Sequence, residues 1–173
     1  ARDLATARPD LIVFGCTSAG ALRGNQYDAD LCRRISDLSG VPTVSVIASV
    51  RQAITASGAR RVGVVTPYVD ALNQRIRESV EADGVAVVGI AGLGISDNFE
   101  IAAVPQERIV DFAEHTLRDL DVDLAFVSCT NFPAVAALPE LERRLGLPVV
   151  TSNQAAIAAV LRLLAAAPAR EGA

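Results

Sequence analysis

The sequence predicts an α/β protein built from two similar halves, each with a parallel sheet. Short apolar runs alternate with helix-length amphipathic stretches, two of the runs end in a Cys-Thr pair, and a Gly-x-Pro element follows each pair. The first run is 10–14 before Cys16, and the second is 123–127 before Cys129, with an aspartate six positions before each cysteine. This repeat indicates two α/β halves that face one another.

Strands are expected where short apolar runs are bounded by turn residues. In chain order these runs lie at 10–14, 41–47, 61–66, 85–90, 123–127 and 146–151. Helical patterns separate most of them, which is typical of parallel strands joined by crossover helices. Pro67 stops the third run, and Gly84 precedes the fourth.

Helices are expected where apolar residues recur every three or four positions. They lie at 27–38, 49–57, 70–82, 105–120 and 153–166, with another after Pro133 and the end of a helix within 1–9. Gly40 and Gly58 end the first two as C-terminal caps. Ser152 or Asn153 is expected to cap the start of the last helix.

Two segments lack periodicity: 91–103 is expected to be a long loop, and 167–173 a frayed tail. The partner strand that would open the first half has no counterpart in the sequence, so we expect that half to be incomplete at its N-terminus. The last helix is expected to return to it. The predicted domains are therefore 1–59 plus 152–173, and 60–151.

The composition excludes several classes of protein. The 173 residues are 51% hydrophobic and carry a formal charge of −4, without lysine or a basic cluster, which argues against nucleic-acid binding. The apolar runs are too short to span a bilayer, and the N-terminus lacks a signal pattern. A cytoplasmic protein that contacts neither nucleic acid nor membrane is the expectation.

The cysteines are the residues with the clearest chemical potential. A thiol between a strand and a helix lies near backbone N–H groups, which favour thiolate, although a single cysteine is more often simply packed. Packing does not explain why Cys16 and Cys129 occupy matching loops, so we interpret both as functional. Cys32 lies within a helix and is expected to pack. His115 falls on the polar side of its helix, which leaves no Cys-His pair.

Six polar residues are candidates for binding a substrate at the same edge: Thr17, Ser18, Tyr68, Asn98, Thr130 and Asn131. The Thr17–Ser18 and Thr130–Asn131 pairs can hydrogen-bond an anion at a helix start, and they would serve equally well as caps. Tyr68 can bind a carboxylate or pack between the halves. Asn98 can reach the site or form a turn.

Four motifs together resemble the maleate isomerase and arylmalonate decarboxylase branch of the aspartate/glutamate racemase superfamily. They are Gly15-Cys16-Thr17-Ser18, Thr66-Pro67-Tyr68, Asp97-Asn98, and Ser128-Cys129-Thr130-Asn131 with Ser152-Asn153-Gln154. The resemblance implies two pseudo-symmetric Rossmann-like lobes with the active site between them. It also implies that Cys16 adds to the alkene of a small dicarboxylate, that Cys129 protonates and deprotonates the adjacent carbon, and that the six polar residues bind substrate.

The expected activity is therefore cofactor-independent isomerisation of maleate to fumarate, without a metal, in a homodimer or higher homo-oligomer. The family begins with a strand that carries another substrate-binding asparagine, which has no counterpart here. Its decarboxylases have glycine at the position of Cys16, and its racemases usually have histidine at the position of Asn131. Two alternatives stay open: a two-cysteine racemase or lyase of another small carboxylate, and a non-catalytic α/β module that binds a small anion.

Overall fold

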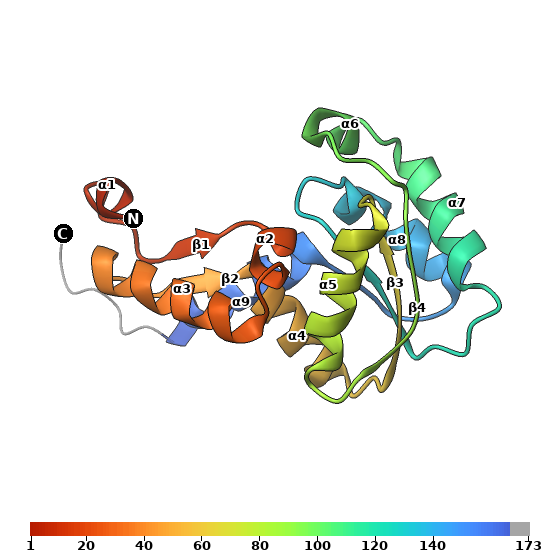
Figure 1. The fold of residues 1–173 in the computed structure, drawn as a ribbon, viewed down its shortest axis with the longest axis horizontal. Coiled ribbons are helices and arrows are strands. Elements are labelled where there is room, and N and C mark those ends of the chain that lie inside the picture. Colours follow the sequence, from red (N-terminus) through yellow and green to blue (C-terminus); the bar gives the residue numbers. More distant parts are fainter. Residues whose placement is uncertain (167–173) are drawn as a thin grey trace.

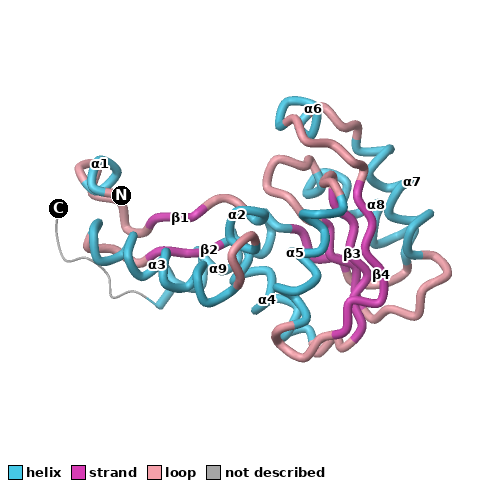
Figure 2. The backbone as a smooth tube through the Cα atoms, viewed as in Figure 1, coloured by secondary structure: helices cyan, strands magenta, loops and turns pink. Residues whose placement is uncertain are grey.

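The computed structural model describes residues 1–166, which form an α/β protein with two parallel sheets. One sheet pairs β1 (Ile12–Phe14) with β2 (Thr43–Ser45). The other has the order β4-β3-β5-β6, from β3 (Arg61–Thr66), β4 (Ala86–Gly92), β5 (Leu124–Val127) and β6 (Val149–Thr151). The two sheets lie at opposite ends of the elongated molecule (Figure 1; Figure 2). The predicted fold class is confirmed.

Five helices surround the two-stranded sheet or join it to the rest of the molecule. They are α1 (Arg2–Ala5), α2 (Thr17–Ala21), α3 (Asn25–Ser39), α4 (Val46–Ser57) and α9 (Ser152–Ala166). Helix α3 packs on both strands, while α9 follows the last strand of the other sheet and returns to pack against α4 and β2. The predicted domain limits, 1–59 plus 152–173 and 60–151, stay predictions.

The remaining helices belong to the four-stranded sheet. They are α5 (Asp70–Glu81), α6 (Asn98–Ala102), α7 (Gln106–Leu117) and α8 (Ala134–Leu145). Helices α7 and α8 lie together on one face of this sheet and α5 lies on the other, as expected for right-handed crossovers. Strands β3 and β5 are buried on both faces, with Val62, Val64 and Phe126 fully enclosed. That explains their continuous apolar runs.

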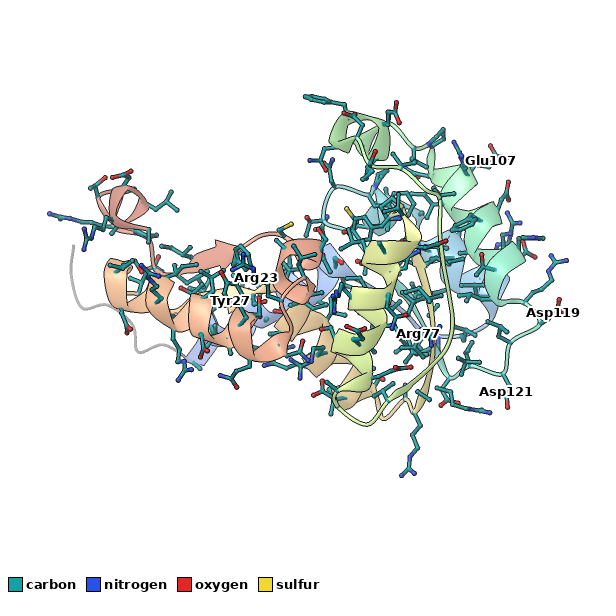
Figure 3. The ribbon with its side chains drawn as sticks, viewed as in Figure 1. Arg23, Tyr27, Arg77, Glu107, Asp119 and Asp121 are labelled. Atoms are coloured by element: carbon teal, nitrogen blue, oxygen red, sulfur yellow. The ribbon has the colours of Figure 1, made fainter. Side chains whose placement is uncertain are left out.

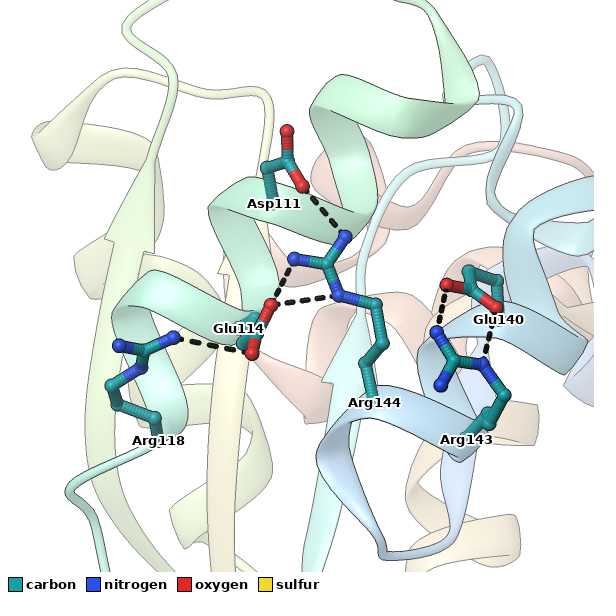
Figure 4. A network of polar contacts seen from close by, with 6 residues as sticks. All are labelled: Asp111, Glu114, Arg118, Glu140, Arg143 and Arg144. Carbon is teal, nitrogen blue, oxygen red and sulfur yellow. Dashed lines mark hydrogen bonds and ion pairs between the residues drawn. The ribbon is translucent and has the colours of Figure 1, made fainter.

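Ion pairs join α7 to α8 across the outside of the sheet. The Arg144 guanidinium on α8 contacts both Asp111 and Glu114 of α7, and Glu114 also pairs with Arg118 (Figure 4). The neighbouring Arg143 forms its ion pair within its own helix, with Glu140. Arg144 therefore makes both of these ion pairs between α7 and α8.

The predicted strand 41–47 is too long, because β2 ends at Ser45 and α4 begins at Val46. The Ser45 hydroxyl accepts a hydrogen bond from the backbone N–H of Ala48 at 3.3 Å. This N-terminal cap starts the helix three residues earlier than 49–57 and overrides the strand preference of the two β-branched residues after it.

The expected loop 91–103 is also partly wrong. Strand β4 extends to Gly92, and the segment contains α6. The carboxylate of Asp97 accepts hydrogen bonds from the backbone N–H groups of Phe99 and Glu100, each at 2.9 Å. An aspartate cap of this kind stabilises a single turn that is too short to show periodicity.

Helix α9 begins at Ser152, but neither Ser152 nor Asn153 is its cap. Thr151 takes that role, because its Oγ1 accepts from the Gln154 N–H at 3.2 Å. The tail predicted at 167–173 lies outside the described residues. Across 1–166, no helix combines the length and the apolarity needed to cross a membrane.

Candidate active site

The two cysteine loops meet, although their strands belong to different sheets. Cys16 follows β1 and immediately precedes α2, and Cys129 follows β5. The hydroxyl of Thr130 donates a hydrogen bond to the carbonyl oxygen of Gly15 at 3.1 Å. The strand ends therefore bring the matching loops into direct contact.

Tyr68 lies between these loops and links the two thiols. Its phenol interacts with Cys129, which raises the pKa of Tyr68, and with Ser18, which lowers it, and the Ser18 Oγ lies 3.5 Å from the Cys16 Sγ. The tyrosine is only 6% exposed. Two sulfur atoms and two hydroxyl groups, those of Cys16, Cys129, Ser18 and Tyr68, are thus gathered around one point, and their roles in catalysis and binding stay predictions.

The environment keeps the Tyr68 phenol protonated. Burial raises the pKa of Tyr68 well above its ordinary value, and the interaction with Cys129 raises it further. The Ser18 hydroxyl lowers the pKa and opposes this shift only in part. Tyr68 can therefore donate a hydrogen bond throughout the pH range in which most enzymes work. The other tyrosine, Tyr27, lies on α3 with Arg23 above its ring at 5.0 Å (Figure 3).

The turn that carries Tyr68 is held by hydrogen bonds and by close packing against β4. Thr66 Oγ1 accepts from the Tyr68 backbone N–H at 2.9 Å and donates to Asn73 Oδ1 at 2.6 Å. The turn also packs tightly on Gly92, because a Cβ there would lie 2.0 Å from the Tyr68 carbonyl oxygen. Only glycine allows this approach of the two backbones.

Cys129 has an unusual backbone conformation. Its φ is +97°, which non-glycine residues rarely adopt and which costs roughly 1–3 kcal/mol. The conformation turns the chain so that the Asn131 N–H donates to the Cys129 sulfur at 3.3 Å. The side chain is buried at 7% exposure. Strained positions of this kind cluster at functional sites.

The prediction that Thr130 and Asn131 lie at a helix start is wrong, because α8 begins only at Ala134 after the turn at Cys129. Thr130 is half-buried and Asn131 exposed, and the Asn131 side-chain amide donates to the carbonyl oxygen of Asn98. Asn98 is itself exposed at the start of α6. Thr130 and Asn131 thus directly follow the Cys129 thiol, whereas Asn98 is linked to it through Asn131, and the roles of all three in binding stay predictions.

Thr17 is placed differently from the other candidates. It is 1% exposed, and its hydroxyl donates to Ser152 Oγ at 2.9 Å, so this group is engaged within the protein. The Cys129 backbone N–H donates to the same oxygen at 3.0 Å. Asn153 also holds the second loop, since its Nδ2 donates to the Thr130 carbonyl at 3.0 Å.

Ser152 and Asn153 were not among the predicted site residues, although they follow β6 at the same edge of the sheet as Cys129 follows β5. Their position at a strand end was the available signal. Cys32 lies on α3, where burial and then Asp28 raise its pKa to about 11, and His115 is exposed on α7. Within 1–166, no group of three or more His, Cys, Asp or Glu residues could hold a metal ion.

The chain is similar in sequence and in fold to known enzymes of one family. The arylmalonate decarboxylase family matches residues 1–173. The arylmalonate decarboxylase of Bordetella bronchiseptica is 32% identical over 148 residues, covering 85% of this chain and 62% of that protein. A maleate isomerase of Geobacillus stearothermophilus is 25% identical over 171 residues, covering 94% and 66%.

The fold is similar to that of a liganded double mutant of arylmalonate decarboxylase, with a TM-score of 0.91 and 28% identity over 96% of this chain and 72% of that one. The chain thus spans less than two thirds of the length of the curated decarboxylase and isomerase. These relatives are enzymes that act on small carboxylic acids, as their names state.

Proposed function

Because the chain belongs to the arylmalonate decarboxylase family and is also similar to maleate isomerases, we propose that it isomerises maleate, or a close cis-dicarboxylate, to the trans form. The observation that carries the proposal is the position of Tyr68. Its phenol contacts Cys129 and Ser18, and Ser18 contacts the Cys16 thiol. Two thiols around one polar point suit a reaction that needs a nucleophile and a proton donor on neighbouring carbons.

The reaction starts when the Cys16 thiolate adds to one alkene carbon and forms a C–S bond. The electron pair of the double bond moves to the neighbouring carbon and its carboxylate, and Cys129 protonates that carbon. The new single bond rotates by half a turn. The Cys129 thiolate then removes the proton, the double bond re-forms, and the C–S bond breaks to release the Cys16 thiolate and the trans acid.

Neutral donors would hold the substrate in this scheme. The protonated phenol of Tyr68 and the hydroxyl of Ser18 can each donate to a carboxylate oxygen next to the thiols. The exposed side-chain amide of Asn131, two residues after Cys129, has a second N–H besides the one that binds the Asn98 carbonyl and can serve the second carboxylate. Fixed donors of this kind also stabilise the negative charge that develops on the carboxylate.

A second candidate is decarboxylation of a substituted malonate, which the 32% identity to the decarboxylase favours. That reaction needs one thiol to protonate the carbanion left by carbon dioxide. Cys129 would suffice, and Cys16 would be dispensable. The two functions are therefore separated by the effect of removing the Cys16 thiol.

The test follows maleate and an arylmalonate by ¹H NMR with the wild type, Cys16→Ser, Cys129→Ser and the control Cys32→Ser. We expect fumarate from the wild type and from the control, and a loss of about 100-fold or more in both other variants. Maleate should also protect Cys16 from iodoacetamide in peptide mapping. Unchanged maleate together with equal labelling of all three cysteines would contradict isomerisation, and arylmalonate turnover that survives Cys16→Ser would favour decarboxylation.

A further inference from the structure

Ser152 contacts both cysteine loops through a single oxygen atom. It has no exposed surface, and its Oγ accepts hydrogen bonds from the Cys129 backbone N–H at 3.0 Å and from Thr17 Oγ1 at 2.9 Å. Cys129 bears one of the two site thiols, and Thr17 directly follows the other, Cys16. The position of each loop relative to the other is thereby tied to this hydroxyl.

The Ser152 hydroxyl does not cap helix α9. Although Ser152 is the first residue of α9, Thr151 Oγ1 accepts the capping hydrogen bond, from the Gln154 N–H. A serine at a helix start is ordinarily explained by capping, and that explanation does not apply here. Both hydrogen bonds that Ser152 Oγ accepts come from the cysteine loops.

The Cys129 backbone needs such support. A residue with φ of +97° keeps this conformation only where its surroundings fix it. The Ser128 N–H donates to the Val65 carbonyl at 2.9 Å on one side, and Ser152 binds the N–H of Cys129 itself. Without Ser152 Oγ, a buried N–H would lose its acceptor at the strained residue, and the loop would relax.

We propose that Ser152 is a positioning residue that fixes the register of the Cys16 and Cys129 thiols, meaning their distance and orientation relative to one another. The inference rests on the proposed function, because the register matters when both thiols act on neighbouring carbons of one substrate. Ser152 does not touch the reacting atoms. It acts through the backbone of Cys129 and the side chain of Thr17.

Removal of the hydroxyl should lower the rate more than it lowers substrate affinity. The three proposed carboxylate donors, Ser18, Tyr68 and Asn131, are not among the hydrogen-bond partners of Ser152 Oγ in the described residues, which are Thr17 and Cys129. A misplacement of about 1 Å between reacting groups lowers a rate by roughly 100-fold. We therefore expect Ser152→Ala to lower kcat by about 100-fold with a change in KM of less than about threefold.

The experiment uses a Cys32→Ser parent, in which Cys16 and Cys129 are the two thiols left. Dibromobimane becomes fluorescent when it bridges two neighbouring thiols, so it reports their register without any turnover. The variants are Ser152→Ala, Ser152→Thr, which keeps the hydroxyl, and Ser49→Ala. Ser49 is a matched control, since it is 2% exposed and its hydroxyl donates to the Ser45 carbonyl at 2.7 Å.

We expect bridging in the parent and in Ser49→Ala, loss of bridging and of kcat in Ser152→Ala, and recovery of both in Ser152→Thr. Bridging and kcat in Ser152→Ala equal to those of Ser49→Ala would overturn the inference, as would absence of bridging in the parent. If Ser152→Ala does not fold, Thr17→Val removes the partner hydroxyl and must reduce bridging. A parent that bridges its thiols but leaves maleate unchanged contradicts the proposed function alone, and bridging in the variants still decides the role of Ser152.

Discussion

The hydroxyl of Thr130 donates to the carbonyl of Gly15 at 3.1 Å and joins two loops that are 115 residues apart in the sequence. Each loop ends a strand of a different sheet. A shift of one sheet against the other would therefore separate the thiols of Cys16 and Cys129. The substitutions below are expected to change the stability of the protein, through the contact region between the two sheets or through the helices packed around it.

Tyr68→Phe should change how stability responds to alkaline pH. Burial and Cys129 raise the pKa of Tyr68 in the folded state, whereas an unfolded phenol ionises near its ordinary pKa of about 10. The stabilisation is fully present below pH 10 and is lost above it, by roughly 1.4 kcal/mol per pH unit, because only the unfolded state releases the proton. Urea unfolding at pH 8, 10 and 11 measures this slope.

The Tyr68→Phe variant should show a shallower alkaline decline in its free energy of unfolding. Tyr27→Phe, which removes the 41% exposed tyrosine, should retain the contribution of Tyr68. Equal slopes in the wild type and Tyr68→Phe would show that the Tyr68 phenol ionises in the folded protein.

Gly92→Ala should destabilise the fold and displace Tyr68. The new Cβ would lie 2.0 Å from the Tyr68 carbonyl oxygen and 2.6 Å from Asn73 Nδ2, and neither a buried backbone nor a buried amide can move freely. We expect a loss of about 1–3 kcal/mol in the free energy of unfolding. Gly15→Ala, whose Cβ would meet nothing within 4 Å, is the stability control, and equal losses in the two variants would contradict the close approach.

Arg144→Gln should lower the urea midpoint at pH 7 more than Arg143→Gln does. Arg144 joins α8 to Glu114 and Asp111 of α7, while Arg143 pairs within α8 (Figure 4). The hydrogen bond from Arg144 lowers the pKa of Glu114, so this stabilisation is present above the ordinary carboxyl pKa and is lost as pH falls through the lowered value. The difference between the variants should shrink in acid and in high salt, and a constant difference would point to packing of the arginine stem.

The sequence predicted β3 to the residue, since the run 61–66 is buried on both faces and bounded by turn residues. The prediction from sequence failed where a hydrogen bond between a polar side chain and the backbone determined the local conformation. Ser45 started α4 inside a run of β-branched residues, and Asp97 formed α6 in a segment without periodicity. A cap of this kind is one hydrogen bond, which hydrophobic patterns do not record.

For the site, parallel strands carry their loops to a common edge, which is why Cys129 and Tyr68 could be expected to meet. The contacts behind them could not be predicted. The hydrogen bond from Thr17 to Ser152 spans 135 residues, and the φ of Cys129 follows from that tertiary framework. No local propensity encodes either of them.

The same hydrogen bond, from Thr17 to Ser152, joins residues that are made early and late in synthesis. The Thr17 loop forms near the start of the chain, yet its partner Ser152 is added only after the last strand, β6. Closing so long a loop costs entropy that is recovered only when the intervening sheet has formed. During synthesis, both cysteines are therefore made before Ser152, and the hydrogen bonds that fix their spacing can form only after β6 and the start of α9 have been added.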